Sequence, residues 1–214
     1  MGTLPRVTDV CVVHALRPGY FHDTAIDKRP VAGPVLVTEI GVDADRQVDS
    51  SHGGPDAAVY VYASEDADHF VSELGRDLPP GSFGENLRTV GLDVTGARLG
   101  ERWRVGEVLL EVRKPRTPCQ NLSLRMGRER FHVEFNRTGR VGAMCQVLEP
   151  GLVAAGDGVS VERRPDHEVT IGRYVTGMTV DQAAQLLAAD LALPRSVRER
   201  ARRVVRRQSA SPQG

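Results

Sequence analysis

Residues 105–122 have the sequence VGEVLLEVRKPRTPCQNL, in which a buried strand leads through a proline-flanked junction into a short helix. The apolar and β-branched residues of 105–112 predict the strand. Residues 120–126 predict the helix, which should end at Gly127. Cys119 is expected in the first turn of that helix, three residues after Arg116. We expect its thiol to ionise easily, because the helix start and the guanidinium both favour a thiolate.

The other two cysteines have apolar neighbours typical of strands. Cys11 and Cys145 are therefore interpreted as small buried residues. An odd number of cysteines without a C-x-x-C pair argues against a disulfide framework. Three cysteines also cannot supply the four thiolates of an ordinary iron–sulfur cluster. Cys119 is left as the one candidate for chemistry.

Composition restricts the function classes. The chain has 214 residues, enough for one sizeable domain and a small appendage, and its 28 Lys and Arg balance 28 Asp and Glu. The balance gives no reason to expect nucleic acid or a membrane surface as a partner. No apolar run approaches the roughly 20 residues of a membrane helix. The N-terminus lacks a secretory signal pattern, so we expect a cytoplasmic protein.

The first 165 residues or so are rich in strands, with long irregular connections that favour a barrel over repeated βαβ units. We predict a fold that is mainly β with α (α+β): a β-barrel with peripheral helices. The predicted strands cover Val7–Leu16, Pro34–Ile40, Ala57–Ala63, Arg102–Val112, Ala143–Glu149 and Gly158–Arg163. The predicted helices are Ser64–Leu74 and Arg128–Asn136.

The chain becomes helical after residue 165, which predicts two domains, 1–165 and 166–214. Thr179 and Ser196 each have the spacing of a capping box, with Gln182 and Glu199 three residues later. They predict helices that end near residues 191 and 208, and residues 170–175 predict a third, short helix. The last helix carries six arginines after its cap, which we interpret as a solvated face rather than a binding surface.

Two glycine-bearing loops contain candidate site residues. In His52-Gly53-Gly54 the glycines let backbone amides approach a ligand, although such a loop alone is often an ordinary turn. Gly84-Glu85-Asn86 offers a carboxylate and an amide after a turn. Lys28 and Arg46 could bind a phosphate or could be exposed surface bases.

Five stretches in consistent order carry a resemblance to a known family. They are Thr24–Pro34, His52-Gly53-Gly54, Gly84–Leu87, Lys114–Cys119 and Gly139–Gly142. They resemble the MOSC domain, named for the C-terminal domain of molybdenum cofactor sulfurase, in its stand-alone bacterial YiiM-like branch. The resemblance covers most of residues 1–163, and the helical end is similar to the three-helix C-terminal domain of that branch.

The resemblance implies a MOSC-type β-barrel that holds a molybdenum–pterin cofactor, with Cys119 as the protein ligand of the metal. It implies that Lys28, Arg46, Arg116 and Arg140 bind the cofactor phosphate. Gly53 and Gly54 would admit the pterin against the backbone. His52, Glu85 and Asn86 would supply hydrogen bonds or protons around it.

The activity implied by the same resemblance is reduction of N-hydroxylated compounds, such as 6-hydroxylaminopurine, to amines. The chain has no G-x-G-x-x-G fingerprint, so the electrons should come from a separate flavin or iron–sulfur reductase. A homodimer is a further expectation from the family.

Three alternatives remain open at this point. The protein could be a carrier of the molybdenum cofactor or of sulfur bound to Cys119. It could be a cysteine hydrolase or transferase, with His52 or His132 as the base. A zinc site is a weaker alternative, because the sequence lacks H-E-x-x-H and paired cysteine–histidine spacing.

Overall fold

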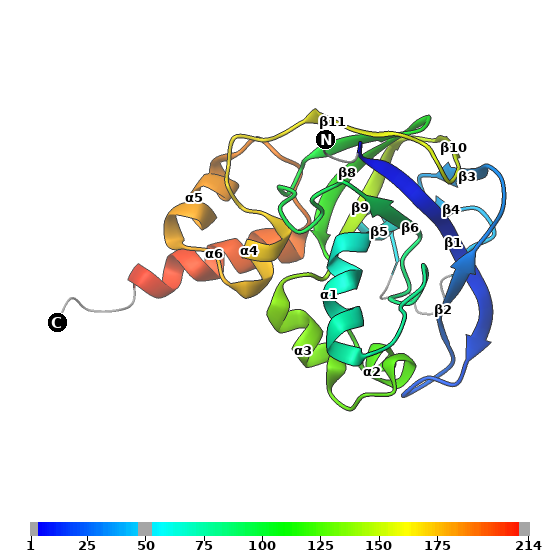
Figure 1. Ribbon diagram of the computed structural model, residues 1–214. Coiled ribbons are helices and arrows are strands. Elements are labelled where there is room, and N and C mark those ends of the chain that lie inside the picture. The colour runs from blue at the N-terminus through cyan, green and yellow to red at the C-terminus, as the bar shows by residue number, and fades with distance from the viewer. Residues whose placement is uncertain (1–3, 47–52, 210–214) are drawn as a thin grey trace.

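The computed structural model describes residues 4–46 and 53–209. Within these residues, eight strands form one mixed sheet in the order β11-β7-β8-β9-β5-β6-β1-β2 (Figure 1). Strands β5 and β6 pair in parallel, and the other neighbours pair antiparallel. A small second sheet has the order β10-β3-β4.

The strands are β1 Arg6–Arg17, β2 Thr24–Pro30, β3 Val35–Thr38, β4 Gly41–Val42, β5 Val59–Ala63, β6 Leu87–Val90, β7 Arg102–Val105, β8 Val108–Pro115, β9 Ala143–Glu149, β10 Gly151–Val153 and β11 Val159–Arg163. The helices are the 3₁₀ turn η2 Pro55–Ala57 and α1 Ser64–Leu74, α2 Gln120–Met126, α3 Phe131–Thr138, α4 Ile171–Thr176, α5 Val180–Ala188 and α6 Arg195–Ser209.

The fold is α+β as predicted, but the expected closed barrel is wrong. Strand order is linear among the described residues, with β11 and β2 at the two edges. The start of β1 does meet the turn before β11: Val7 N donates to Asp157 O at 2.8 Å, and Val159 N donates to Pro5 O at 2.9 Å. That contact amounts to one bridge pair, Arg6 with Gly158, rather than a strand ladder. The sheet therefore curves without closing.

The sequence patterns predicted the bounds of several helices and strands correctly. Helices α1 and α2 and strand β9 have the predicted bounds. The single strand predicted over Arg102–Val112 is instead the hairpin β7–β8. It turns at Gly106, which has φ +55° and where a Cβ would lie 2.5 Å from the carboxylate of Asp157. Strands β2 and β6 were not predicted, since neither shows clear alternation of apolar residues.

An aromatic cluster forms the core beside the sheet. Tyr62 from β5 contacts Phe83 and Phe135. Phe70 of α1 contacts Phe83, Phe131 and Phe135, and the distances from its ring centroid to theirs are 5.1–5.8 Å. These phenylalanines are fully buried. The cluster attaches α1 and α3 to β5 and to the loop before β6. It thereby gives the 83–86 loop a rigid base.

The C-terminal helices α4, α5 and α6 lie together beside one side of the sheet (Figure 1). The capping box of α5 is confirmed, because Thr179 Oγ1 accepts from Gln182 N and Gln182 Oε1 accepts from Thr179 N. The capping box predicted at Ser196 is wrong, because α6 begins at Arg195 and Glu199 pairs with that arginine at 2.7 Å. The division of the chain into two domains near residue 165 stays a prediction.

Hydrogen bonds from two buried or partly buried arginines attach the segment that carries α4–α6 to the β6–β7 connection and to β8. Arg98 Nη1 donates to Pro165 O at 2.7 Å, and Arg113 Nη2 donates to Ala192 O. Of the helices in the described residues, none is long and apolar enough to cross a membrane.

Candidate functional site

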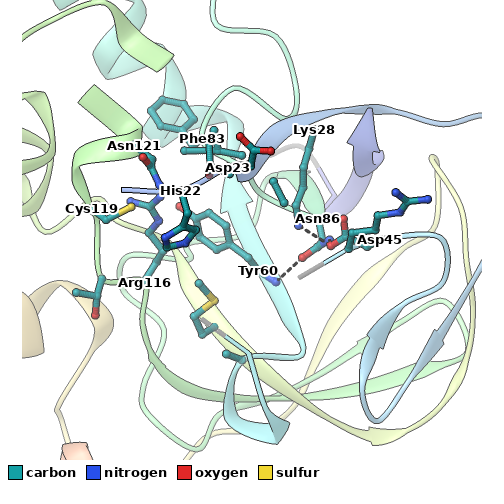
Figure 2. A pocket seen from close by; sticks show the side chains of 18 residues that line it. His22, Asp23, Lys28, Asp45, Tyr60, Phe83, Asn86, Arg116, Cys119 and Asn121 are labelled. Atoms are coloured by element: carbon teal, nitrogen blue, oxygen red, sulfur yellow. Dashed lines mark hydrogen bonds and ion pairs between the residues drawn. The ribbon is translucent and has the colours of Figure 1, made fainter. Parts of the chain in front are cut away.

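A cavity open to solvent lies between β2, the 83–86 loop and the start of α2, and it measures about 850 Å³ with the open space in front of it included. Five of the predicted site residues line it: Lys28, Arg46, Asn86, Arg116 and Cys119. In the view of Figure 2, Cys119 and Arg116 lie toward one end, and Lys28, Asn86 and Asp45 lie toward the other. The ring of Tyr60 lies between the two groups. The fold thus brings together residues that are up to 91 positions apart in the chain, Lys28 and Cys119.

Cys119 is the N-cap residue of α2, so it directly precedes the helix rather than lying in its first turn as predicted. Its backbone is extended, with φ −120° and ψ 173°, and its side chain makes no capping hydrogen bond. Its carbonyl oxygen accepts from Leu122 N at 3.0 Å, and the residue lines the cavity. Cys119 is partly exposed and forms no disulfide. It is therefore accessible to a ligand in the cavity.

The other two cysteines are buried in strands, as predicted. Burial raises the pKa of Cys11 to about 12 and the pKa of Cys145 further still. Both thiols therefore stay protonated and behave as small apolar groups. Only Cys119 combines a thiol with access to the cavity in the described part of the chain.

Arg116 has a buried guanidinium that lacks a counter-ion within the described residues. The residue is 8% exposed, and its Nη1 is buried without a hydrogen-bond partner. Its guanidinium carbon lies 5.9 Å from the centroid of the Tyr60 ring, and its backbone N donates to Gly142 O. A buried cation of this kind is costly unless an anion neutralises it. The cavity is therefore built to receive negative charge beside Cys119.

Asp45 joins the other polar groups of the cavity into one network. Its Oδ2 accepts from Lys28 Nζ at 2.6 Å and from Asn86 Nδ2 at 2.8 Å, and its Oδ1 accepts from Val13 N at 3.0 Å (Figure 2). Asp45 was not predicted. In the sequence only its position beside Arg46 pointed to it, because its three hydrogen-bond partners come from distant segments.

Asn86 completes this network from the opposite side. Its Oδ1 accepts from Tyr60 N at 3.1 Å, and its Nδ2 also donates to Cys11 O at 3.3 Å. Because its oxygen and its nitrogen are both used, Asn86 holds β1, β5 and Asp45 together rather than offering a free amide. Lys28 keeps two of its three donors after the bond to Asp45.

Tyr60 and the β1–β2 connection were also missed. The hydroxyl of Tyr60 donates to Val141 O at 2.8 Å, and burial raises its pKa far enough to keep the phenol protonated. His22, Asp23 and Asn121 also line the cavity. Asn121 Oδ1 accepts from Tyr20 N at 2.8 Å, which fixes the β1–β2 connection against α2.

The structure does not bring Glu85 or Arg140 to the cavity, which corrects both predictions. Glu85 is fully buried; its carboxylate accepts from Gly81 N and Phe83 N and pairs with Arg88. With both oxygens occupied, it has no access to a substrate proton. Arg140 is half-exposed outside the cavity and pairs with Asp66 at 2.7 Å.

The glycine loop is only partly described. Gly53 and Gly54 are not among the residues that line the cavity, although Ala57, which follows them, does line it. Gly54 has φ +91° with nothing within 4 Å of a Cβ, so its backbone conformation rather than a close contact requires glycine here. His52 lies outside the described residues, and its role stays a prediction.

Two of the alternative chemistries lose support from this geometry. His132 Nδ1 lies 2.8 Å from Ser123 Oγ, and His132 is absent from the cavity lining, so it cannot serve as a base for Cys119. Among the described residues, no three His, Cys, Asp or Glu side chains are grouped to hold a metal ion. That finding removes a zinc site of the usual ligand set from the described part.

Comparison with known proteins identifies the class. Residues 48–160 match the MOSC domain, so the chain belongs to the MOSC domain family. Protein YiiM of Escherichia coli is 33% identical over 168 residues, which cover 76% of this chain and 70% of YiiM. The uncharacterized protein YflK of Bacillus subtilis is 31% identical over 169 residues, which cover 78% of this chain and 76% of YflK.

A third relative and two solved structures agree with this placement. A protein of Gibberella moniliformis named reductase is 35% identical over 149 residues, which cover 66% of this chain but only 26% of that protein. YiiM of Geobacillus stearothermophilus matches with a TM-score of 0.76 at 25% identity, covering 94% of this chain and 99% of that one. YiiM of Escherichia coli matches with a TM-score of 0.72 at 26% identity, covering 98% and 96%.

Proposed function

We propose that this chain binds a molybdenum–pterin cofactor in the cavity beside Cys119 and reduces N-hydroxylated compounds to amines. The observation that carries the proposal is the buried guanidinium of Arg116, which has no partner within residues 4–46 and 53–209 and lies in the same cavity as the accessible thiol of Cys119. The family and its reductase-named relative agree with an oxidoreductase of this kind.

The residues of the cavity fit such a cofactor. A thiolate is a suitable ligand for a metal that is already held by dithiolene sulfurs. Arg116 would receive the cofactor's negative charge, and Arg46 lines the same cavity as a second cation. Lys28, which is paired with Asp45, would add N–H donors. Asp45 and Asn86 would fix Lys28 in place from behind.

When bound, the cofactor would supply the two-electron chemistry that removes oxygen from nitrogen. The overall conversion of R–NHOH to R–NH₂ and water consumes two electrons and two protons. His22 and Asp23 are titratable groups at the open side of the cavity and would relay those protons from solvent. Tyr60 stays protonated and donates to Val141 O, so it shapes the cavity floor without releasing a proton.

The electrons would come from a separate flavin or iron–sulfur reductase, and the protein would act in the cytoplasm as a homodimer. None of these three features is needed for the first test, because a chemical reductant can replace the partner.

Metal analysis of protein from a molybdenum-replete host is that test. We expect about one molybdenum per chain in the native protein and almost none in Cys119→Ser, whereas Cys145→Ala, a buried cysteine outside the cavity, should keep the metal. Reduced methyl viologen should then support reduction of 6-hydroxylaminopurine by the native protein and by Cys145→Ala, but not by Cys119→Ser. Intact protein that never holds molybdenum would refute the proposal, and a persulfide on Cys119 without metal would favour the carrier function.

A further inference from the structure

A second groove runs along β2, outside the cavity described above. Its volume is about 770 Å³ with the open space above it included, and its walls include Arg17, Arg29 and Arg125 together with Pro79 and Pro80. The three arginines come from the end of β1, from β2 and from α2. Nothing in the proposed reduction uses this groove.

One buried carboxylate holds the three guanidinium groups together. Asp27 Oδ2 lies 2.9 Å from Arg17 Nε and 3.7 Å from Arg29 Nη2, and Asp27 Oδ1 lies 3.0 Å from Arg125 Nη1. Burial alone would raise the pKa of Asp27, but the hydrogen bond from Arg17 and the charge of Arg125 hold it below its ordinary value. Asp27 is therefore a constant anion that organises the arginines.

The charges in the groove do not balance. Lys28 also borders it, but its ammonium group is neutralised by Asp45 on the cavity side. Three guanidinium groups therefore face one carboxylate, which leaves two positive charges uncompensated within the described residues. Their mutual repulsion would be relieved by a doubly charged anion.

The three arginines differ in how many of their N–H donors remain available to a ligand. Arg125 also donates to Ser82 O and Gly81 O, so its nitrogens are used and it serves as an anchor. Arg17 and Arg29 are about half-exposed, with side-chain accessibilities of 54% and 53%. Both approach the same oxygen of Asp27, at 2.9 Å for Arg17 Nε and 3.7 Å for Arg29 Nη2, so the two guanidinium groups are neighbours that retain further N–H donors.

The wall opposite β2 is rigid. Gly81 has φ +86°, and a Cβ there would lie 2.3 Å from Lys28 O, so the 79–84 loop packs directly on β2. The buried carboxylate of Glu85 fixes this loop through Gly81 N at 2.8 Å and Phe83 N at 3.0 Å. The groove is therefore preformed, and ligand binding would not have to order it.

We propose that this groove is a second anion site, which binds the phosphate group of a phosphomonoester through Arg17 and Arg29. A phosphate dianion matches both the uncompensated charge and the forked donors of two guanidinium groups. The site lies outside the cavity that contains Cys119 and does not depend on the proposed cofactor.

Calorimetric titration with inorganic phosphate, AMP and adenosine tests this proposal. The titration uses the full chain with Arg116→Met, because the unpaired guanidinium of the cavity would otherwise bind phosphate itself. We expect phosphate and AMP to bind this variant and adenosine not to bind. Tighter binding of AMP than of phosphate would identify a nucleotide-like ligand, and equal affinity would identify the free oxyanion.

Adding Arg17→Gln and Arg29→Gln should weaken phosphate binding by about tenfold or more, because two charge-assisted bonds are lost. Adding Arg202→Gln and Arg203→Gln, two exposed arginines of α6, removes the same charge and should leave binding unchanged. Equal binding by the two sets of variants, or no phosphate binding at all with Arg116→Met, would overturn the proposal. Molybdenum content measured on Arg17→Gln/Arg29→Gln should match that of the native protein, and a loss would show that the groove serves the cofactor instead.

Discussion

Replacement by methionine should change the stability of the protein in opposite directions at two buried arginines, Arg88 and Arg116. Arg88 is 3% exposed, pairs with Glu85 and lies 5.6 Å and 5.7 Å from the rings of Tyr62 and Phe83. Arg116 is 8% exposed, and its Nη1 has no partner within the described residues. Methionine keeps most of the aliphatic stem of either side chain and removes the charge. The comparison therefore isolates what the guanidinium contributes.

For cofactor-free protein, Arg116→Met should raise the free energy of unfolding by about 1 kcal/mol. Removing a buried, unsatisfied donor recovers about 1–3 kcal/mol, from which the lost cation–π contact with Tyr60 subtracts about 0.5–1 kcal/mol. The melting temperature of a chain of this size would rise by about 2–4 °C. Arg88→Met leaves Glu85 buried without its partner and should cost about 3–5 kcal/mol.

Thermal and urea unfolding of both variants, with molybdenum content measured on the same preparations, provides the assay. Arg116→Met should be slightly more stable than the cofactor-free native protein and should hold much less metal. A loss of stability in Arg116→Met as large as that in Arg88→Met would refute the reasoning, because it would show that the cavity already neutralises Arg116 without a ligand.

Three further outcomes follow from the same contacts. Asp45→Ala removes the acceptor shared by Lys28 and Asn86 and should lower cofactor affinity about 10–100-fold. The measurement is the molybdenum that the variant retains during dialysis, and retention equal to that of the native protein would contradict this prediction. Burial lowers the pKa of His167, whose Nδ1 accepts from Val169 N, so the folded protein favours the neutral imidazole. The contribution of His167 to the free energy of unfolding is therefore complete above pH 6.5, the ordinary pKa of histidine, and is lost as the pH falls below 6.5. Urea midpoints at pH 5 and pH 7.5 should therefore differ more in the native protein than in His167→Gln, and equal differences would exclude His167 as the cause. Gly142→Ala places a Cβ 2.7 Å from Tyr60 and Tyr62 at φ +74°, whereas at Gly127, where φ is +63°, nothing lies within 4 Å of a Cβ. In urea unfolding, Gly142→Ala should therefore lower the free energy of unfolding by at least about 2 kcal/mol more than Gly127→Ala. Similar losses in the two variants would mean that the backbone angle alone matters.

Elements with local signals could be predicted from the sequence. Helix α5 begins at a Thr-x-x-Gln capping box, and α1 and α2 end at glycines with positive φ, at residues 75 and 127. These signals act over one helical turn, so they are visible in the chain order. The same reasoning failed at Ser196, because the helix begins two residues earlier than predicted: α6 starts at Arg195, and the carbonyl of Pro194 accepts from Arg198 N.

Features that depend on distant partners could not be predicted in the same way. Whether the sheet closes depends on how the start of β1 meets the residues before β11, and local patterning does not specify that register. The Asp45 network joins residues 28, 45 and 86, which the fold alone brings together. Glu85 and Asn86 are adjacent in the sequence, but the first turns into the 79–85 loop and the second toward the cavity.

Lys28 and Arg116, two of the basic residues that line the cavity, differ in their partners, and this difference indicates different roles. The ammonium group of Lys28 is fixed in direction by a carboxylate 2.6 Å away, so it can donate its remaining hydrogens along defined lines without much net charge. Within the part of the chain that the structure describes, Arg116 has no ion-pair partner and one unsatisfied nitrogen, and it lines the same cavity as the accessible thiol. A fold that needed both groups only for stability would have paired Arg116 as well, as it pairs Arg88. We therefore infer that a guanidinium left without a partner by the described residues serves an anionic ligand, at the expense of stability in the ligand-free protein.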